Sequence, residues 1–577
     1  MFKSAYYNTY SSTIHLWDSY GYDCFHWVPY VFIKGEGNIK TIDGISVEKK
    51  TFSSYQDYYS YCKDRHHMFE DKVRPEIQFL AERYHDTPDD QIETPFLKTY
   101  FLDIEVLHEK SFPKPEDADY PIVLISLFDN EKGTSITFGE KQCDIENYIY
   151  CSDEKMLLSR FFAYMNENPC DVLSGWNIQG FDIPYIINRS KKVFGEDANI
   201  YRLMSPIKIV RLWYSQSGEM NMDIAGTTIL DYMDIYKWYS PNKLESYSLD
   251  FVSNYEIEKG KLDYSEYKDL RDLYNENWKM YVEYNIIDAK RVYEIEDKLG
   301  YIKLVQALSL LTKVPMKYYH AQTQLIEGYL LTYYRRNNLC APHFYGGSQQ
   351  TFEAAYVKEP LKGLYEWIID LDITSSYPTA IITLNMSPET YFGRILGIDE
   401  NNIMLYTKRK VFPEFDMLKN DGLVKINGKK LDNFNSALKR RLFSIAPCGS
   451  IFSTTNNGIF SIFERQVFEK RKSAKDEMLK LKLSLPELRD ENLKKSKERV
   501  AQLSSQQLAL KVLLNALFGI TAVPFSRYFN TNISEAITSC GRQTIKAGEK
   551  YTNELLNSPN EDIMIILDQI KAEVNLI

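Results

Sequence analysis

The chain has 577 residues, more than one hydrophobic core usually supports, so we expect several domains. Hydrophobic residues make up 44% of it and charged residues 26%, and no apolar run reaches the roughly 20 residues that a membrane-spanning helix needs. The start lacks the pattern of a secretory signal, and the eight scattered cysteines show no metal-binding spacing. These features argue against a membrane protein, an exported protein and a zinc ribbon, and we expect a soluble cytoplasmic protein.

The net charge of −10 conceals a gradient along the chain. Between Lys408 and Lys511 there are 23 Lys or Arg residues against 12 Asp or Glu residues, so this stretch carries +11 and the remainder carries −21. A locally positive surface on an acidic protein is expected of an enzyme that holds a phosphate backbone. A solvated basic helix face would give the same composition, and charge alone does not choose between the two.

The first third of the chain predicts a β-rich domain followed by an α/β domain. Residues 1–97 contain short strand candidates rich in Tyr and Val and broken by Gly and Asp, which predict the β-rich N-terminal domain. Strands and helices then alternate over residues 98–311, beginning with the strand candidates Thr99–Val106 and Pro121–Leu127. Within this α/β domain, Ile209–Tyr214, a Ser-Gly turn and Met220–Ile224 predict a β-hairpin.

The rest of the chain predicts a second α/β region interrupted by helices. Residues 312–462 form a linker and the first part of this region, which opens with the strand candidate Trp367–Ile373. Two long helices are expected over residues 463–519, with a break near Leu485-Pro486 because proline disfavours a continuous helix. Residues 520–577 complete the region with a helix and an apolar strand candidate. The fold class is therefore multidomain α/β.

Four carboxylates in the first α/β domain come from three separate elements. Asp103 and Glu105 lie two apart in one strand, so their side chains project from the same face. Asp182 follows a glycine-bounded loop at a predicted helix start, and Asp288 lies four residues after Tyr284 on one helix face. Two Mg²⁺ or Mn²⁺ ions about 4 Å apart need several hard oxygen ligands from separate elements, and such a pair activates a water molecule and stabilises a leaving oxygen. The alternative interpretation is a coincidental acidic surface.

In order and spacing, these segments match the motifs D-x-E, N-x-x-x-F-D and Y-x-x-x-D, and so resemble the proofreading exonucleases with an RNase H-like fold. The resemblance implies a 3′→5′ exonuclease domain in which two metal ions are bound by Asp103, Glu105, Asp182 and Asp288. It also implies that Tyr284 orients the attacking water and that Asn177 and Phe181 hold the frayed 3′ end. Resembling polymerases use a hairpin such as the one predicted above to help part primer from template.

A second acidic motif stands in the second α/β region. Asp372 ends an apolar strand candidate and begins the turn D-I-T-S-S-Y-P, which can offer backbone N–H groups to phosphate oxygens while the aspartate faces a cation. The turn resembles motif A of family B DNA polymerases, with Ser376 where leucine is usual. The following segment Asn385–Thr390 is similar to that of T-even-type phage polymerases. The resemblance implies that Asp372 is a catalytic metal ligand, that Ser375 and Ser376 bind the nucleotide, and that Tyr377 excludes a 2′-hydroxyl.

Polar residues recur at helical spacing on the two long helices. Arg471 and Lys475 are four apart on the first, while Lys511, Asn515 and Phe518 fall at i, i+4 and i+7 on the second. Facing each other across a hairpin, the cations would grip a triphosphate and neutralise the charge that builds as pyrophosphate leaves. Without motif A, an ordinary amphipathic helix would explain the second set equally well.

The second helix carries K-V-L-L-N-A-L-F-G, which is similar to motif B of the same family, with Ala516 for serine and Phe518 for tyrosine. The resemblance implies a two-helix fingers hairpin whose nucleotide-binding residues are Arg471, Lys475, Lys511 and Asn515. The DNA contacts that it implies, in addition to Asn177 and Phe181, are Phe518, Gly519 and the loop residues Tyr345, Gly346 and Gly347.

The third palm motif of the family, D-T-D-S, is matched only in its first aspartate, Asp568, where a further catalytic residue is expected. After it the sequence departs from the family pattern, and no thumb follows. We therefore expect an incomplete palm. A split polymerase completed by a second polypeptide, an interrupted gene translated past its junction, or a trimmed chain would each explain this departure, and the sequence leaves these alternatives open.

The chain as a whole resembles the front part of a family B DNA polymerase of the tailed-phage, T-even-like type. The resemblance implies a DNA-directed DNA polymerase with proofreading, acting in replication in the cytoplasm of a phage-infected host cell. Its expected cofactors are two Mg²⁺ or Mn²⁺ ions per active site. Its expected partners are primer-template DNA, deoxynucleoside triphosphates and a second polypeptide carrying the rest of the palm and the thumb. A stand-alone 3′→5′ DNA exonuclease and a non-catalytic DNA-binding remnant are the alternatives.

Overall fold

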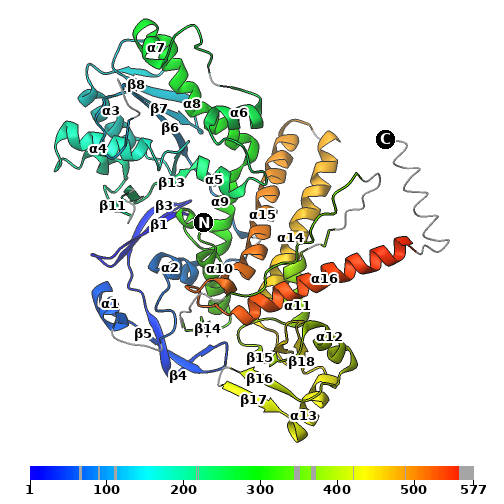
Figure 1. Ribbon diagram of the computed structural model, residues 1–577. Coiled ribbons are helices and arrows are strands. Elements are labelled where there is room, and N and C mark those ends of the chain that lie inside the picture. Colours follow the sequence, from blue (N-terminus) through cyan, green and yellow to red (C-terminus); the bar gives the residue numbers. More distant parts are fainter. Residues whose placement is uncertain are drawn as a thin grey trace. The chain divides into compact units, whose positions relative to one another are not determined.

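The computed structural model describes residues 1–63, 68–88, 91–108, 113–215, 218, 220–260, 262–343, 351–364, 372–373, 375–419, 422–487 and 489–557 (Figure 1). The chain divides into two compact units. Unit 1 comprises residues 1–39, 46–341 and 474–509, and unit 2 comprises residues 40–45, 342–473 and 510–577. No described helix is long and apolar enough to cross a membrane.

Unit 1 begins with two small sheets and two helices. Strands β1 (Phe2–Asn8), β2 (Thr13–Asp18) and β3 (Gly21–His26) form an antiparallel meander, and β4 (Val31–Thr41) lies between β5 (Ser46–Lys50) and β14 (Leu339–Cys340). The sequence pattern predicted strands here but not the helices α1 (Tyr55–Lys63) and α2 (Pro75–Tyr84). Buried Glu70 binds Arg335 and accepts a hydrogen bond from the backbone of Ala341, which ties this region to later parts of unit 1.

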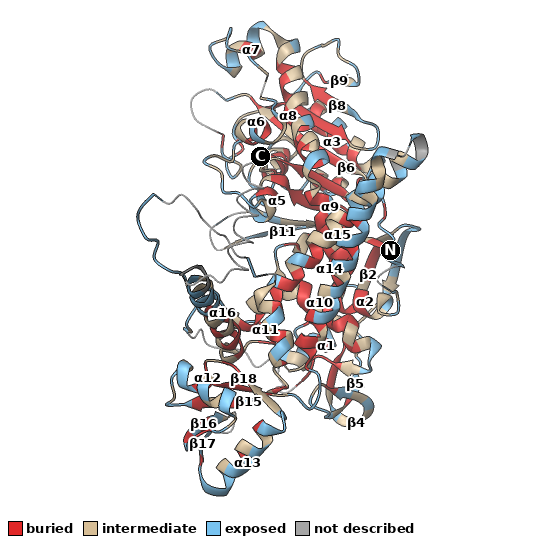
Figure 2. Cartoon of the chain, turned by 90° about the vertical axis from the view of Figure 1, so that its right-hand side faces the viewer, coloured by how far each residue is buried: buried red, intermediate tan, exposed pale blue. Residues whose placement is uncertain are grey.

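The centre of the first α/β region is a six-stranded mixed sheet with the order β13-β10-β6-β7-β8-β9. Its strands are β6 (Thr99–Val106), β7 (Ile122–Asp129), β8 (Thr134–Gly139), β9 (Tyr148–Tyr150), β10 (Val172–Gly175) and β13 (Thr228–Asp231). Strand β6 runs parallel to β10 and antiparallel to β7. Every residue of β7 is buried, as expected of a strand covered on both faces. Figure 2 shows β6 and β8 within a largely buried region.

Helices cover both faces of this sheet. On one face, Leu102, Ile104 and Ile125 pack into a core with α3 (Glu154–Glu167) and α4 (Asp182–Phe194). On the other face, Leu124 packs with α7 (Leu270–Glu276) and α8 (Trp278–Leu299). The residues of β6 that alternate with Leu102 and Ile104 therefore face α8. The contact between the Phe101 ring of β6 and the Tyr293 ring of α8, with centroids 5.8 Å apart, confirms this orientation.

The remaining elements of unit 1 surround this sheet. They are η2 (Ile200–Met204), β11 (Val210–Tyr214), β12 (Met220–Ile224), α5 (Tyr232–Tyr239), α6 (Leu249–Ile257), α9 (Tyr301–Thr312), η3 (Met316–Tyr318) and α10 (Gln322–Arg336). Strands β11 and β12 pair antiparallel from Val210–Ile224 to Tyr214–Met220, so the predicted hairpin is confirmed.

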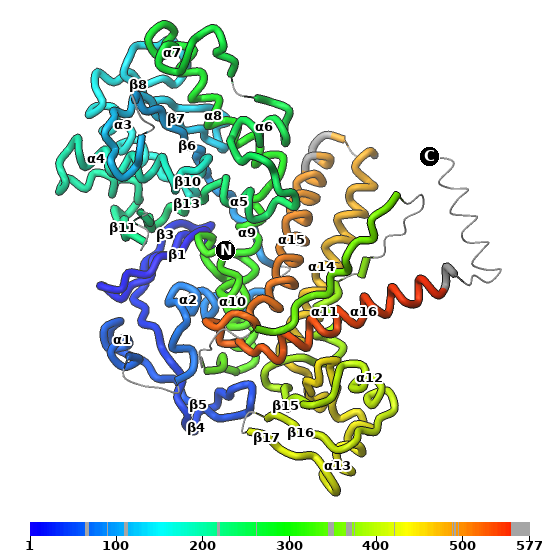
Figure 3. Tube along the Cα trace, viewed as in Figure 1, coloured from blue at the N-terminus to red at the C-terminus, as the bar shows by residue number. Residues whose placement is uncertain are grey.

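Two long helices, α14 (Ile459–Ser484) and α15 (Asp490–Ala522), flank the short 3-10 helix η4 (Leu485–Glu487). The break predicted near Leu485-Pro486 is confirmed. In the part that belongs to unit 1, Ala474 and Met478 of α14 pack against Leu503 of α15, and Arg499 binds Glu477 at 2.9 Å. The two helices therefore run as an antiparallel pair there (Figure 3).

Unit 2 contains an antiparallel sheet with the order β17-β16-β15-β19-β18. Its elements are α11 (Ser376–Leu384), β15 (Tyr391–Leu396), α12 (Glu400–Arg409), β16 (Phe415–Lys419), β17 (Gly422–Ile426), α13 (Gly428–Lys439), β18 (Phe443–Ile445), β19 (Ser450–Ser453), the remaining parts of α14 and α15, and α16 (Thr531–Asn557). Arg394 of β15 binds Glu535 of α16 through two hydrogen bonds of 2.7 Å, which fixes this helix against the sheet. Most of the predicted strand Trp367–Ile373 lies outside the described residues.

Candidate functional site

The predicted pair on β6 stands on the face that meets α8. Asp103 and Glu105 are half-buried, whereas their neighbours Leu102 and Ile104 are buried on the opposite face. The carboxylates therefore project from a strand whose other side is fixed in the core. Such a strand holds its polar side chains more rigidly than a loop would.

Asp182 lies against the same strand. It is the first residue of α4, only 5% exposed, and its Oδ1 accepts a hydrogen bond of 3.2 Å from the backbone nitrogen of Ile104. Ile104 stands between Asp103 and Glu105 in the chain, so this bond places a third carboxylate beside the pair. Burial raises the pKa of Asp182 to about 7, although hydrogen bonds from backbone N–H groups act to lower it.

The loop before α4 is held by a carboxylate that the sequence analysis missed. Asp231 is 1% exposed and accepts hydrogen bonds from the backbone nitrogens of Asn177 at 3.1 Å and Gln179 at 3.0 Å, while it also caps α5. Burial raises its pKa to about 6. Asn177 has a φ of 63°, a backbone conformation that asparagine tolerates better than most residues. Aspartate is a preferred residue at the N-cap of a helix, and this preference is the sequence signal that could have pointed to Asp231.

Helix α8 binds both carboxylates of β6. Asn285 Nδ2 donates a hydrogen bond of 2.6 Å to Asp103 Oδ2, and the Tyr281 hydroxyl donates one of 3.5 Å to Glu105 Oε2. Asn285 lies next to Tyr284 in the chain and one turn before Asp288. Tyr284 and Asp288 are 3% and 5% exposed, respectively, so all three predicted motifs meet around β6.

The aromatic residues predicted for this site are also present beside it. The Tyr284 ring packs edge-on against Tyr264 at 5.6 Å, and Phe181 packs against Tyr185 at 5.5 Å. Neither Tyr281 nor Asn285 was singled out from the sequence. Both are uncharged, and helical spacing alone does not show which neutral donors meet a carboxylate on another element.

The four carboxylates are the type of ligand that divalent cations prefer, although their oxygen atoms do not converge on a single position in this structure. In the part of the chain that the structure describes, no group of three or more His, Cys, Asp or Glu side chains is arranged to hold a metal ion. The carboxylates bind neutral N–H and O–H donors instead. Four hard oxygen ligand groups nevertheless come from three elements that meet at β6, and a cation there would favour the ionised form of buried Asp182. These residues therefore fit a pair of divalent cations.

In unit 2, the predicted motif A residues precede and begin α11. Asp372 is exposed, Ser375 has a φ of 54°, and Ser376 and Tyr377 lie in the first turn of the helix. The Tyr377 ring packs on Phe518 of α15, with ring centroids 4.8 Å apart. A side chain at Gly541 of α16 would begin 3.1 Å from this tyrosine ring, which explains a glycine there.

The predicted cationic residues are only partly brought together. Lys511 and Asn515 are exposed and share one face of α15, while Gly519 is half-buried one turn further on. Arg471 belongs to the same unit, whereas Lys475 belongs to unit 1. The structure thus places Lys511, Asn515 and Arg471 in the unit that contains Asp372.

Two comparisons with known proteins bear on these sites. The exonuclease domain profile of DNA polymerase family B matches residues 44–252, and the profile of DNA polymerase family B matches residues 313–575. The chain belongs to DNA polymerase family B. This family B chain therefore combines an exonuclease domain with polymerase palm sequence in a mixed α/β fold with several sheets.

The chain is similar to phage polymerases and to cellular ones. It is 27% identical to the DNA-directed DNA polymerase of Escherichia phage RB69 over 79% of this chain and 55% of the relative. It is 26% identical to the DNA-directed DNA polymerase of Enterobacteria phage T4 over 80% of this chain and 56% of the relative. The DNA polymerase delta catalytic subunit of Dictyostelium discoideum is 27% identical over 85% of this chain and 42% of the relative. The chain thus spans about half the length of these relatives.

Some predicted residues of the polymerase region lie outside the described part of the chain. These are Asp568 and the loop residues Tyr345, Gly346 and Gly347. Their roles stay predictions.

Proposed function

We propose that this chain acts in DNA replication as a DNA-directed DNA polymerase with 3′→5′ proofreading exonuclease activity. The observation that supports the exonuclease most directly is the meeting of its three motifs at β6. Asp182 accepts a hydrogen bond from Ile104 of this strand, and Asn285, beside Tyr284, donates one to Asp103. The names of the phage relatives support the polymerase.

In the proposed exonuclease site, two Mg²⁺ or Mn²⁺ ions held by Asp103, Glu105, Asp182 and Asp288 would supply a hydroxide nucleophile and stabilise the leaving 3′-oxygen. Tyr284 orients the attacking water from α8. Asn177 and Phe181 hold the unpaired 3′ end, since both lie on the loop that leads into Asp182. Asp231 keeps this loop in place through the backbone nitrogens of Asn177 and Gln179.

In the proposed polymerase site, Asp372 binds the catalytic cations and Ser375 and Ser376 bind the nucleotide. Lys511, Asn515 and Arg471 bind the triphosphate, with Lys475 one turn along α14 from Arg471. We assign α14 and α15 to the fingers. Tyr377 lies beneath the sugar, held by its contact with Phe518, so that a 2′-hydroxyl would collide with the ring.

The requirement of synthesis for a second polypeptide with the rest of the palm and the thumb stays a prediction, as does action in the cytoplasm of an infected cell. Primer extension by the purified chain, with and without such a polypeptide, tests the first. Extension that needs the polypeptide and is lost in Asp372→Ala would support it. Extension by the chain alone would contradict it.

A stand-alone 3′→5′ exonuclease is the second candidate, because the four carboxylates and Tyr284 all belong to unit 1. The two candidates share one test. We expect Mg²⁺-dependent shortening of 5′-labelled single-stranded DNA from its 3′ end, abolished by chelation of the metal and by Asp103→Ala together with Glu105→Ala.

The matched control for that test is Asp119→Asn, which alters an exposed carboxylate of the same domain that binds Lys192 at 2.6 Å. It should degrade DNA at the wild-type rate. Undiminished nuclease activity in the double alanine variant would show that the active site lies elsewhere. A wild-type chain that binds DNA without degrading it would favour a non-catalytic role.

A further inference from the structure

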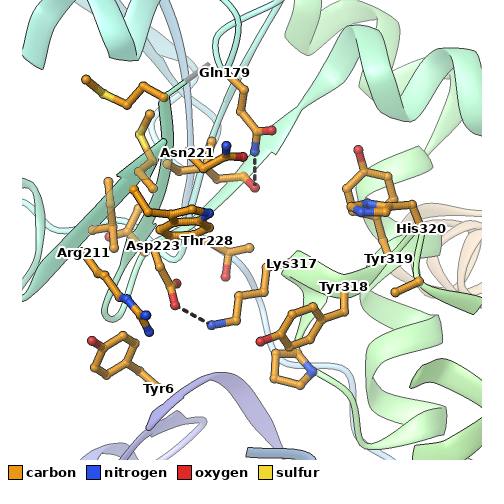
Figure 4. Close-up of a pocket in the computed structure, with 18 of the residues that line it drawn as sticks. Tyr6, Gln179, Arg211, Asn221, Asp223, Thr228, Lys317, Tyr318, Tyr319 and His320 are labelled. Atoms are coloured by element: carbon orange, nitrogen blue, oxygen red, sulfur yellow. Dashed lines mark hydrogen bonds and ion pairs between the residues drawn. The ribbon is translucent and has the colours of Figure 1, made fainter. Parts of the chain in front are cut away.

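A cavity of about 1360 Å³ within unit 1 joins the loop before α4 to the β11–β12 hairpin. Asn177, Gln179 and Gly180 line one part of its wall, and Arg211, Trp213 and Tyr214 of the hairpin line another. Segment 315–321, strand β1 and parts of α2, α4 and α5 also line it. Figure 4 shows Gln179 on one side of the cavity and Arg211 and Tyr6 on another.

Lys317 crosses this cavity from η3 to the hairpin. Its Nζ lies 2.7 Å from Asp223 Oδ2 of β12 and 5.8 Å from the centre of the Tyr6 ring of β1 (Figure 4). It also lies 3.7 Å from Glu76 Oε1 of α2. One ammonium group therefore contacts the hairpin and two elements of the N-terminal region.

The ion pair is sheltered from solvent. The Lys317 side chain is 22% exposed, and those of Asp223 and Glu76 are 23% and 11% exposed. Burial alone would lower the pKa of Lys317, but the attraction of Asp223 and Glu76 outweighs it and raises this pKa. The lysine thus stays charged at neutral pH, and partial burial makes its ion pair stronger than one on an open surface.

Lys317 adds a fixed point to the hairpin, whose inner side packs on the main core through Val210, Leu212, Met220 and Met222. An isolated two-stranded hairpin is only marginally stable in water. Trp213 of β11 is 45% exposed on the side opposite Val210 and Leu212, so this outer side has little packing, and Tyr214 at the end of the strand is 60% exposed. Exposed aromatic rings of this kind stack on unpaired bases. Their position relative to the Asn177–Gly180 loop would influence which DNA end reaches that loop.

We propose that Lys317 is a positioning residue that fixes the β11–β12 hairpin beside the Asn177–Gly180 loop, and thereby sets how readily the exonuclease removes nucleotides from a paired 3′ end. This inference rests on the proposed exonuclease function. A hairpin released from Lys317 would leave paired ends less well separated. Single-stranded DNA needs no separation, so its degradation would not change.

The test compares one 5′-labelled oligonucleotide alone and annealed to its complement. For Lys317→Met, we expect about a 10-fold slower excision from the duplex end, which corresponds to about 1.4 kcal/mol, and a single-strand rate within about twofold of wild type. Lys317→Arg should restore most of the duplex rate because it keeps the charge. Asp223→Asn should reproduce the defect, and combining it with Lys317→Met should add little.

The matched control is Lys192→Met, which breaks another Lys–Asp pair of the same domain, at 2.6 Å from Asp119 and outside the cavity. It should leave the ratio of duplex to single-strand rates unchanged. An equal loss in this control, or equal slowing on both substrates in Lys317→Met, would mean that Lys317 only attracts DNA or supports the fold, and would overturn the proposal.

A second measurement does not depend on activity. Hydrogen exchange of the amides of β11 and β12 should become on the order of 10-fold faster in Lys317→Met, while the thermal midpoint and the exchange of β6 and β7 stay as in wild type. Unchanged hairpin exchange in a folded variant would overturn the positioning role. A wild-type chain without nuclease activity would refute the proposed function instead, and the exchange result would still show whether Lys317 holds the hairpin.

Discussion

The acidic residues of the two units differ in how the fold holds them. In unit 1, Asp103 accepts a hydrogen bond from Asn285 and Asp182 accepts one from the backbone of Ile104, on a strand whose opposite face is buried. In unit 2, Asp372 is exposed, and it follows residues that lie outside the described part of the chain. Carboxylates fixed on a core strand are positioned before any cation arrives, which lowers the cost of assembling the site. The acidic residues of the exonuclease region are therefore held by the packing around them, whereas Asp372 is exposed.

The largest effect that tests this comparison is expected for Asp182→Ala. Loss of a proposed buried metal ligand would remove electrostatic stabilisation of the transition state, so kcat/KM on single-stranded DNA should fall on the order of 10²- to 10³-fold. Asp372→Ala should leave the same kinetic constant within about twofold of wild type, because excision does not use it. Equal losses in both variants would show that the two acidic sites are not independent.

The sequence predicted the elements that carry the carboxylates because their patterns are local. Alternation marked β6 and placed Asp103 and Glu105 on one face, and the glycine-bounded loop placed Asp182 at the start of α4, as the structure shows. The hairpin and the break between α14 and α15 were predicted for the same reason.

The side chains that hold the carboxylates could not be predicted in this way. Asn285 and Tyr281 act across elements that are far apart in the chain, and no periodicity indicates which neutral donor will meet which acid. Lys317 was missed for a related reason, since a single lysine in a short turn carries no pattern. Only the packing of three segments gives it a role.

Two buried glutamates extend the comparison to stability. Glu296 of unit 1 is 7% exposed and accepts hydrogen bonds from the backbone nitrogens of Ile302 and Lys303 and from the Tyr232 hydroxyl. Glu464 of unit 2 is fully buried, and its carboxyl oxygens have no hydrogen-bond partner among the described residues. Burial raises the pKa of both groups, that of Glu296 to about 7.

We expect Glu464→Leu to stabilise the protein by about 2 kcal/mol at pH 8, because it removes an unsatisfied buried group. Because the pKa of Glu464 is higher in the folded state than in the unfolded state, its carboxyl is protonated in both states below about pH 4.5 and its charge then costs no stability. As the pH rises above this value, the unfolded state ionises more readily and the free energy of unfolding falls. The gain in the thermal midpoint should therefore grow from pH 4.5 to pH 8. Glu296→Leu, the matched control, should destabilise, since it leaves three donors unpaired. A gain that does not depend on pH would contradict the assignment of the cost to the Glu464 charge.

A smaller effect is expected from shortening the hairpin. Deleting residues 214–221 removes the tip together with Tyr214 while leaving most of β11 and the Asp223–Lys317 pair. Excision from duplex ends should slow several-fold more than excision from single strands, because the exposed Tyr214 ring no longer meets unpaired bases. Rates on both substrates should be measured with the same labelled strand. Equal slowing on the two would count against a role in separating paired ends.

The smallest expected effect concerns the ring contact that orders the unit 2 site. Tyr377 and Phe518 join the start of α11 to α15 with centroids 4.8 Å apart, and this contact is what holds Tyr377 while Asp372 remains exposed. In a double-mutant cycle, Tyr377→Ala and Phe518→Ala should show a coupling of about 1 kcal/mol in denaturant unfolding of the chain. Tyr377→Ala combined with Phe434→Ala, which lies in the separate core of the antiparallel sheet, should be additive within about 0.5 kcal/mol. If the Tyr377–Phe518 pair is equally additive, the rings touch without stabilising each other, and the order of this site must come from the nucleotide or the DNA that we propose it binds.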